Sequence, residues 1–84
     1  MGRKAAERPQ LLSLKLKQIR LFLDFTQEQM FEALIDKGAD VHLGYVSLFE
    51  TGQRIPSLLV LLAYSRISGV EMEVFVDDTL ELTD

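Results

Sequence analysis

The 84-residue sequence contains no cysteine and no tryptophan, and His42 is its one histidine. The absence of cysteine excludes a disulfide framework and a thiolate metal site, which fits a reducing cytoplasm. One histidine and no Ser-His-acid spacing leave no nucleophile–base pair, so the sequence does not indicate an enzyme. Asp77 and Asp78 lack the ligand spacing of a calcium loop, and the glycines are too dispersed for a phosphate-binding loop. We therefore expect no catalytic residue, no metal and no cofactor.

Long hydrophobic runs are also missing from the sequence. The longest clean apolar run covers residues 58–63, far fewer than the ~20 residues that a bilayer span needs. The basic start could imitate a signal peptide, but four polar or charged residues interrupt the apolar stretch behind it. These are Lys15, Lys17, Gln18 and Arg20. Because 48% of the residues are hydrophobic, the chain can build one shared core, and we expect a soluble, cytoplasmic, single-domain protein.

Charge is unevenly distributed along the chain, whose formal net charge is −4. Residues 1–20 carry six bases and one acid, whereas residues 71–84 carry six acids and no base. Charges separated by more than ~10 Å are largely screened, so one side of an acidic protein can still face phosphates. We interpret residues 1–10 as a flexible basic arm, 11–76 as the folded domain and 77–84 as an acidic tail. The uneven charge of the two termini is explained equally well if both ends are simply exposed to solvent and have no function.

The first helix is predicted over residues 11–23, where an apolar stripe recurs at helical spacing. The stripe consists of Leu12, Leu16, Ile19 and Leu23. Lys15 and Lys17 fall on other faces of this helix, where they are available for phosphate contacts. Thr26 then provides a cap and Gln29 completes a capping box, so a second short helix is predicted to begin there.

A turn is predicted at residues 36–40, which contain one glycine and two aspartates. The short helix after this turn is predicted to bury one apolar edge. That edge consists of Val41, Tyr45, Val46 and Phe49. Gly52 supplies the left-handed residue that ends the helix, and Pro56 prevents the chain from resuming a helix at once.

A fourth helix is predicted from a cap at Ser57 to a stop at Gly69. We expect its core face to contain Leu58, Leu61, Leu62 and Ser65. Its outward face is then apolar too, which indicates a surface covered by a partner. The residues of that predicted dimer interface are Leu59, Val60 and Ala63. A last short helix is predicted over residues 70–76, and residues 77–82 alternate weakly, as a strand would.

Two short helices, of which the second ends in Glu-x-Gly-x-Arg-x-Pro at residues 50–56, are typical of a helix-turn-helix DNA reader. From residue 12 to residue 76 the sequence resembles the lambda-repressor-like family, the Cro/CI-type (XRE) helix-turn-helix domains. No single motif carries this resemblance; the order and spacing of the motifs do. It implies an all-α, compact five-helix domain with the helix-turn-helix at the second and third helices.

The resemblance also implies roles for individual residues. Arg20 and Glu50 occupy the positions of a partly buried ion pair that locks the first helix to the third. The implied DNA-binding residues are Gln27, His42, Leu43, Gly44, Ser47, Leu48, Gln53 and Arg54. Within this set Gln27, Gln53 and Arg54 would contact phosphates, and the others would face the bases. The sequence departs from the family at Phe31, where alanine is usual, and in the insertion at 36–40.

The sequence therefore predicts a sequence-specific transcriptional regulator that binds double-stranded DNA as a homodimer, with the third helix in the major groove. The implied setting is the cytoplasm of a bacterium or the context of a phage. Because Leu43 and Leu48 are apolar, we expect them to pack on thymine methyl groups. The alternative is a protein-interaction module of the same fold that has lost specific DNA contacts. The acidic total and the two leucines favour the alternative, whereas Gln27 and the turn at residues 53–56 favour DNA.

Overall fold

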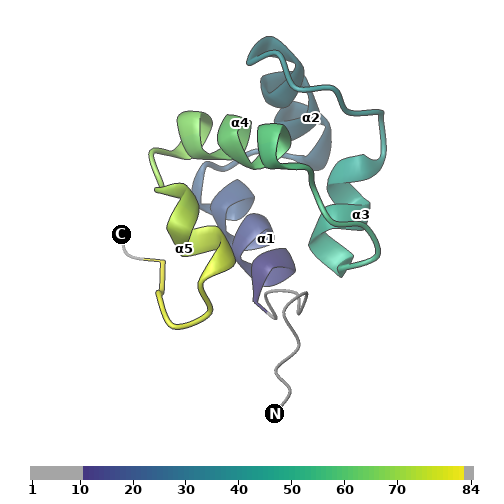
Figure 1. The fold of residues 1–84 in the computed structure, drawn as a ribbon. Coiled ribbons are helices and arrows are strands. Elements are labelled where there is room, and N and C mark those ends of the chain that lie inside the picture. Colours follow the sequence, from purple (N-terminus) through teal and green to yellow (C-terminus); the bar gives the residue numbers. More distant parts are fainter. Residues whose placement is uncertain (1–10, 83–84) are drawn as a thin grey trace.

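The computed structural model describes residues 11–82, which form five α-helices and no strand. The helices are α1 (Leu12–Phe22), α2 (Gln27–Asp36), α3 (Tyr45–Thr51), α4 (Leu58–Ser68) and α5 (Met72–Val76) (Figure 1). The predicted all-α class is confirmed for this part of the chain. The arm predicted at residues 1–10 lies outside the described residues.

The helix α1 lies between α3 on one side and α5 on the other, and it contacts both. Its predicted stripe does face the core, because Leu12, Leu16 and Ile19 are buried and Leu23 is half-buried. The helix α2 contacts α3 and α4, and α4 also contacts α5. The five helices therefore enclose one apolar core around α1, with the α2–α3 pair and α5 on different sides of it (Figure 1).

The helix ends follow the predicted local signals. Thr26 accepts a hydrogen bond from the backbone N–H of Gln29, whose side chain accepts one from the N–H of Thr26. This is a complete capping box at the start of α2. Ser57 caps α4 by accepting from the N–H of Val60, and Gly69 ends α4 with a φ of 78°. Each signal lies within a few residues of the helix end that it specifies, which is why the sequence is sufficient to predict it.

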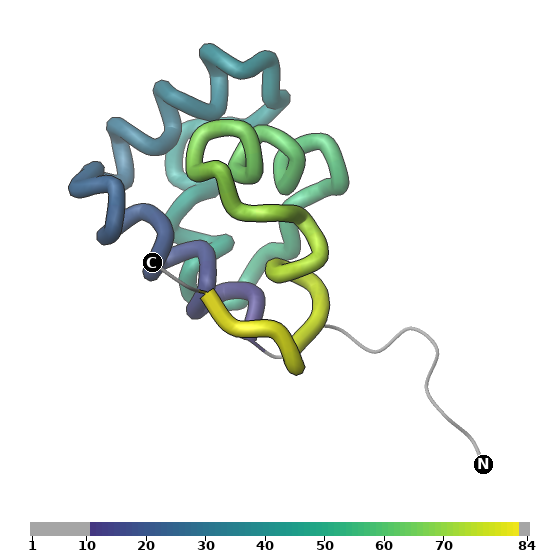
Figure 2. The backbone as a smooth tube through the Cα atoms, turned by 90° about the vertical axis from the view of Figure 1, so that its left-hand side faces the viewer, coloured from purple at the N-terminus to yellow at the C-terminus, as the bar shows by residue number. Residues whose placement is uncertain are grey.

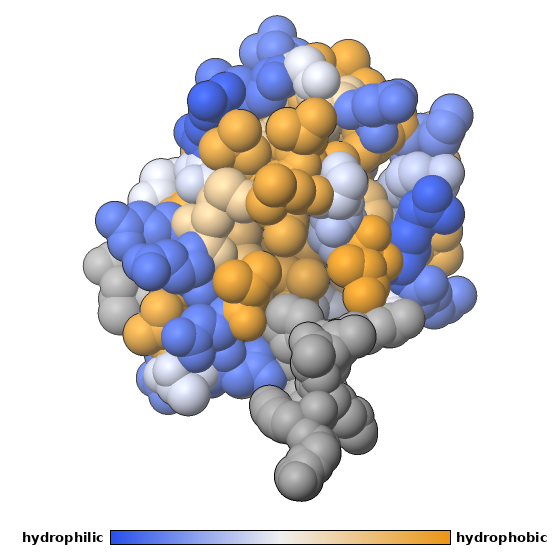
Figure 3. Space-filling view, in the orientation of Figure 1, coloured by the Kyte–Doolittle hydropathy of each residue, from blue (hydrophilic) through white to orange (hydrophobic). Residues whose placement is uncertain are grey.

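The predicted core face of α4 is confirmed at Leu61, which is buried, but is wrong at other positions because the helix is rotated. Leu58 was expected inside and is 70% exposed, whereas Val60 and Ala63 were expected outside and are each 3% exposed. Leu61 and Tyr64 complete the buried face. Val60 and Ala63 therefore contact the core of the chain itself and are excluded from the predicted dimer interface, which leaves Leu59 exposed. Figure 3, in the orientation of Figure 1, shows exposed apolar side chains gathered over α4 near the centre of the view.

Lys15 also differs from its prediction, because it is buried and 4% exposed. Its ammonium group donates to the carbonyl oxygens of Val74 at 2.6 Å, Leu80 at 2.8 Å and Asp77 at 3.1 Å. These carbonyls lie in α5 and in the turn after it, so Lys15 ties α1 to the C-terminal segment. Figure 2 shows α5 and this segment, in yellow, crossing the first turns of α1.

Residues 77–82 form a turn rather than the strand that their alternation suggested. The side-chain carboxylate of Asp77 accepts hydrogen bonds from the backbone N–H and the hydroxyl of Thr79, which close a local turn. These two bonds hold the pKa of Asp77 below its ordinary value. No helix in the described part of the chain has the length and hydrophobicity that a bilayer span requires.

Candidate nucleic-acid interface

The connection between α2 and α3 is longer than the predicted five-residue turn and covers residues 37–44. Ala39 and Val41 are buried in it, so the connection packs on the core. It ends at Gly44, whose φ of 94° suits glycine, and α3 then begins at Tyr45. Consequently His42, Leu43 and Gly44 precede α3, and the prediction that they lie on the face of that helix is wrong.

The predicted ion pair between Arg20 and Glu50 is present. The Nε of Arg20 donates to one carboxylate oxygen of Glu50 at 2.6 Å, and Nη2 donates to the other at 3.0 Å. The side chains are 11% and 3% exposed, respectively. The third guanidinium nitrogen, Nη1, donates to the carbonyl of Phe25 at 2.9 Å, just before α2 begins. The hydrogen bond to Glu50 raises the pKa of Arg20 above its ordinary value. One arginine thus fixes the end of α3 and the start of α2 on α1.

Gln27 joins the same network from the first turn of α2. Its side-chain Nε2 donates to Oε1 of Glu50 at 3.2 Å. The predicted phosphate-contacting amide therefore lies directly beside the end of α3, although it is engaged with a carboxylate. Glu28, which is exposed, adds an acid to the same turn. Phe31, in the next turn, is half-buried and packs against the core.

The end of α3 is closed by a Schellman-type turn. The N–H of Gln53 donates to the carbonyl of Leu48 at 3.0 Å, and that of Gly52 donates to the carbonyl of Phe49 at 3.3 Å. Gly52 adopts the predicted left-handed conformation, with a φ of 80°. The N–H of Arg54 also donates to the carbonyl of Leu48, at 3.2 Å. The turn is therefore fixed by its backbone, and both Gln53 and Arg54 are exposed.

A cluster of rings beside Arg54 was not anticipated from the sequence. The guanidinium carbon of Arg54 lies 4.0 Å from the ring centroid of Tyr45, a cation–π contact. The ring of His42 meets Tyr45 edge-on at 5.0 Å, and Phe49 does so at 6.0 Å. Tyr45 and Arg54 have no periodic relationship in the sequence, so only the closed turn after α3 brings them together. The contact holds the Arg54 side chain beside the start of α3.

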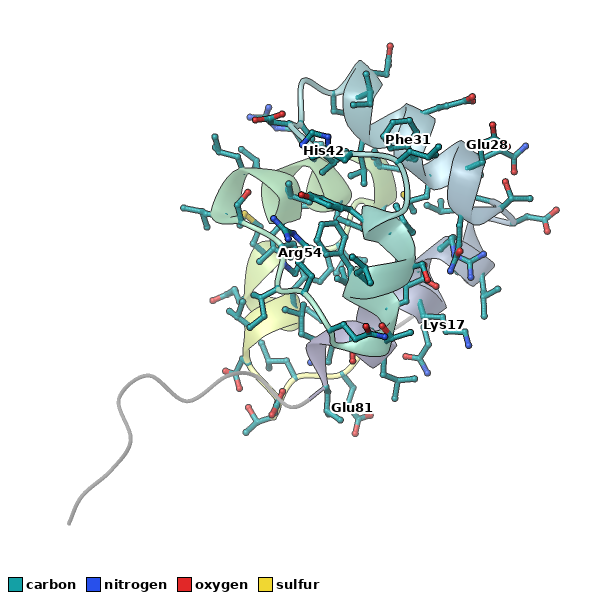
Figure 4. The ribbon with its side chains drawn as sticks, turned by 90° about the vertical axis from the view of Figure 1, so that its right-hand side faces the viewer. Lys17, Glu28, Phe31, His42, Arg54 and Glu81 are labelled. Atoms are coloured by element: carbon teal, nitrogen blue, oxygen red, sulfur yellow. The ribbon has the colours of Figure 1, made fainter. Side chains whose placement is uncertain are left out.

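Among residues 11–82, two exposed cationic side chains lie around α3. Arg54 and Lys17 are exposed, and Figure 4 shows them on opposite sides of α3. Leu43 is 74% exposed in the preceding connection. Ser47 and Leu48 are only half-buried and are therefore less accessible than the sequence suggested. The helix itself exposes Thr51, which was not predicted; its hydroxyl donates to the carbonyl of Leu48.

The described residues form no metal centre, because no three His, Asp or Glu side chains among residues 11–82 come together to hold an ion. Tyr64 is the one buried polar side chain in this part of the chain whose hydroxyl makes no hydrogen bond. Burial raises the pKa of Tyr64 above its ordinary value, and the nearby Glu50 carboxylate adds to the effect. No protein-family model, no curated protein and no solved structure matches this chain.

Proposed function

We propose that the chain is a sequence-specific, DNA-binding transcriptional regulator of the XRE type, with a lambda-repressor-like helix-turn-helix formed by α2 and α3. The observation that carries the proposal is the network of Arg20, Glu50 and Gln27. It fixes the end of α3 against both α1 and the start of α2 through hydrogen bonds of 2.6 to 3.2 Å. Such a fixed pair of short helices presents one rigid surface to a duplex, which a helix-turn-helix requires.

The charge around α3 supports contact with phosphates despite the net charge of −4. Lys17 and Arg54 flank α3, and the exposed Gln53 adds a neutral donor beside Arg54. Arginine and lysine positioned on two sides of a recognition element can bind the two phosphate backbones that border a major groove. Lys15 has no part in this binding, because its ammonium group is used by three carbonyls within the chain.

Base recognition falls mainly to Leu43 in this account. Its side chain is 74% exposed immediately before α3, whereas Leu48 is half-buried. An apolar side chain cannot bind the acceptors of guanine, but it can pack on the C5-methyl group of thymine. One buried methyl is worth roughly 0.8 kcal/mol, less than the ~1–3 kcal/mol of a bidentate hydrogen-bonded pair. We therefore infer modest specificity with a preference for thymine.

The proposal includes a homodimer, because XRE-type regulators are expected to bind paired half-sites. Leu58 and Leu59, each 70% exposed at the start of α4, support an interface there. This interface replaces the predicted set, of which Leu59 alone remains at the surface. Neither leucine belongs to the α3 face, so dimer contact and DNA contact use different residues.

Selection of bound duplexes from a random DNA pool tests the function. We expect enrichment of a thymine-containing motif, and we expect deoxyuridine in place of one of its thymines to weaken binding by about fourfold, the equivalent of one methyl group. If no motif is enriched at low salt, the proposal fails.

The second candidate is a protein-interaction module of the same fold. The exposed Leu43 and the scarcity of exposed polar groups on α3 favour it, because an apolar face suits a protein partner better than base edges. Failure to enrich any duplex, together with loss of a bound protein on Leu43→Ala, would establish this candidate instead.

A further inference from the structure

A groove with a volume of about 760 Å³ lies between α1, the end of α4, α5 and the C-terminal segment. Its apolar lining includes Ile19, Val70 and Val74, and its edge carries Phe22, which is 73% exposed. The volume falls within the range of about 300–1,000 Å³ that is usual for ligand sites. The exposed ring of Phe22 therefore extends the apolar area of the groove onto the surface. Contiguous exposed apolar area of this kind marks interaction sites.

The groove lies on the flank of α1 that faces away from α3. Successive residues of an α-helix are about 100° apart, so Gln18 and Phe22, which line the groove, point away from Ser13 and Arg20. Arg20 binds Glu50 of α3, and Ser13 lies against Gly52 just after it. A molecule in the groove therefore leaves the α3 face free, and the groove does not depend on the proposed DNA binding.

The charge of the groove is negative. Among the described residues that line it, the charged ones are Glu71 and Glu81. Both are exposed, and the sequence from residue 71 to residue 84 contains no lysine or arginine that could neutralise them. Lys15 packs nearby on α1 but donates to three backbone carbonyls. An apolar groove with carboxylates at its edge is complementary to a partner that is both apolar and cationic.

The exposed apolar surface extends beyond the groove along α1. Leu14 and Leu21 are 50% and 56% exposed on the solvent side of the helix, with the exposed Lys17 between them, and Leu21 directly precedes Phe22. A small molecule would fill the groove without covering this stripe, whereas a helix lying along α1 would cover both. A second copy of the chain is a poor occupant, because a two-fold contact would bring Glu71 and Glu81 of both copies together.

We propose that the groove between α1 and α5 binds a basic amphipathic helix of a partner protein. The apolar face of that helix packs on Phe22, Val70 and Val74, and its lysines or arginines pair with Glu71 and Glu81. This is the helix-in-groove mode of recognition, in which apolar anchors provide affinity and charge selects the partner. A helix that covers the stripe of Leu14 and Leu21 would also lie beside the exposed Lys17, one of the two side chains proposed above to bind phosphate.

A synthetic amphipathic helix of leucine and lysine, about five turns long and labelled with a fluorophore, serves as the probe. The same helix with glutamate in place of lysine is its control. We expect the full-length chain to bind the lysine helix and not the glutamate helix. We expect Phe22→Ser, and separately the double variant Glu71→Gln/Glu81→Gln, to weaken binding by about tenfold or more.

The matched control is Glu28→Gln/Asp40→Asn, which removes two exposed acids of α2 and the connection after it, neither of which lines the groove. It should change affinity by less than about twofold, the general effect of net charge. Equal losses in the two double variants would overturn the proposal, as would no binding of the lysine helix. Sedimentation provides the remaining test. If it shows a dimer that Phe22→Ser dissociates, the groove binds a second copy of the chain, and the proposal is also overturned. Circular dichroism establishes that each variant is folded.

Discussion

Arg20 and Glu50 form a two-point ion pair across the contact of α1 with α3, at 2.6 and 3.0 Å. The Glu50 side chain is only 3% exposed, so the carboxylate depends on Arg20 and Gln27 for its compensation. A buried pair of this kind contributes modestly by itself, but the loss of one partner leaves a charge stranded out of water. The pair therefore fixes the position of α3 on α1. Its effect on the free energy of unfolding is seen when one of the two partners is removed.

The first prediction concerns this coupling. Arg20→Met should lower the free energy of unfolding by ~3–5 kcal/mol, because it strands Glu50. The double variant Arg20→Met/Glu50→Gln should lower the free energy of unfolding by clearly less than the sum of the losses in the two single variants. Urea unfolding of the four proteins measures the cycle, and Arg66→Met, at an exposed arginine on α4, is the control with an expected effect within about 0.5 kcal/mol. Additive effects would show that the two side chains are not coupled.

A second prediction compares two lysines on α1. Lys15→Met should lower the free energy of unfolding by about 2–4 kcal/mol, because it removes a charged donor from three carbonyls. Lys17→Met removes the same charge from an exposed position and should change stability by less than about 0.5 kcal/mol. Urea unfolding distinguishes the two, and equal effects would contradict the buried role of Lys15.

A third prediction concerns pH. The pKa of Tyr64 is raised above its ordinary value of 10.0 in the folded chain, so above pH 10 the unfolded chain loses this proton while the folded chain retains it. Stability should therefore be unaffected by Tyr64 below pH 10 and should fall above it, with a slope approaching about 1.4 kcal/mol per pH unit. Tyr64→Phe should remove this part of the slope.

At neutral pH, Tyr64→Phe should be nearly neutral or stabilising, because the buried hydroxyl makes no hydrogen bond. Tyr45→Phe, at the half-buried second tyrosine, is the matched control. Parallel alkaline unfolding curves for the wild type and Tyr64→Phe would refute the assignment.

The success of the sequence in predicting helix ends and its failure on α4 have one physical cause. Caps such as Thr26 and Ser57 act on backbone groups within three residues, so the local sequence contains the information. The run at residues 58–63 is apolar on all sides, so its periodicity defines no core face. Packing against α2 and α5 decides the rotation, and that packing is not a local property.

Lys15 and the candidate interface illustrate the same limit. Lysine is rarely buried, and the carbonyls that bind Lys15 lie about 60 residues away in the sequence. The pair of Arg20 and Glu50 was expected only through the family resemblance, since nothing in the spacing of residues 30 apart indicates contact. The position of His42 and Leu43 before α3 depends on where the helix begins, which is the least certain feature of a sequence-based prediction.

A fourth prediction concerns the homodimer. Leu59→Glu should weaken self-association at least about tenfold, because a charge enters the apolar interface proposed at the start of α4. Leu43→Glu alters a leucine of similar exposure outside α4 and should leave association unchanged. Sedimentation at micromolar concentration measures both. A monomeric wild type, or equal weakening in the two variants, would contradict this interface.

The central claim, that the face around α3 binds DNA, is tested most directly by the salt dependence of binding to an enriched duplex. Arg54→Ala should weaken binding and lower the slope of log affinity against log salt by about 0.9, the share of one phosphate contact. Arg66→Ala removes the same charge from α4 and should leave the slope unchanged. Circular dichroism verifies that Arg54→Ala is folded without its contact to Tyr45. If both variants retain the wild-type slope, Arg54 binds no phosphate and the account is contradicted.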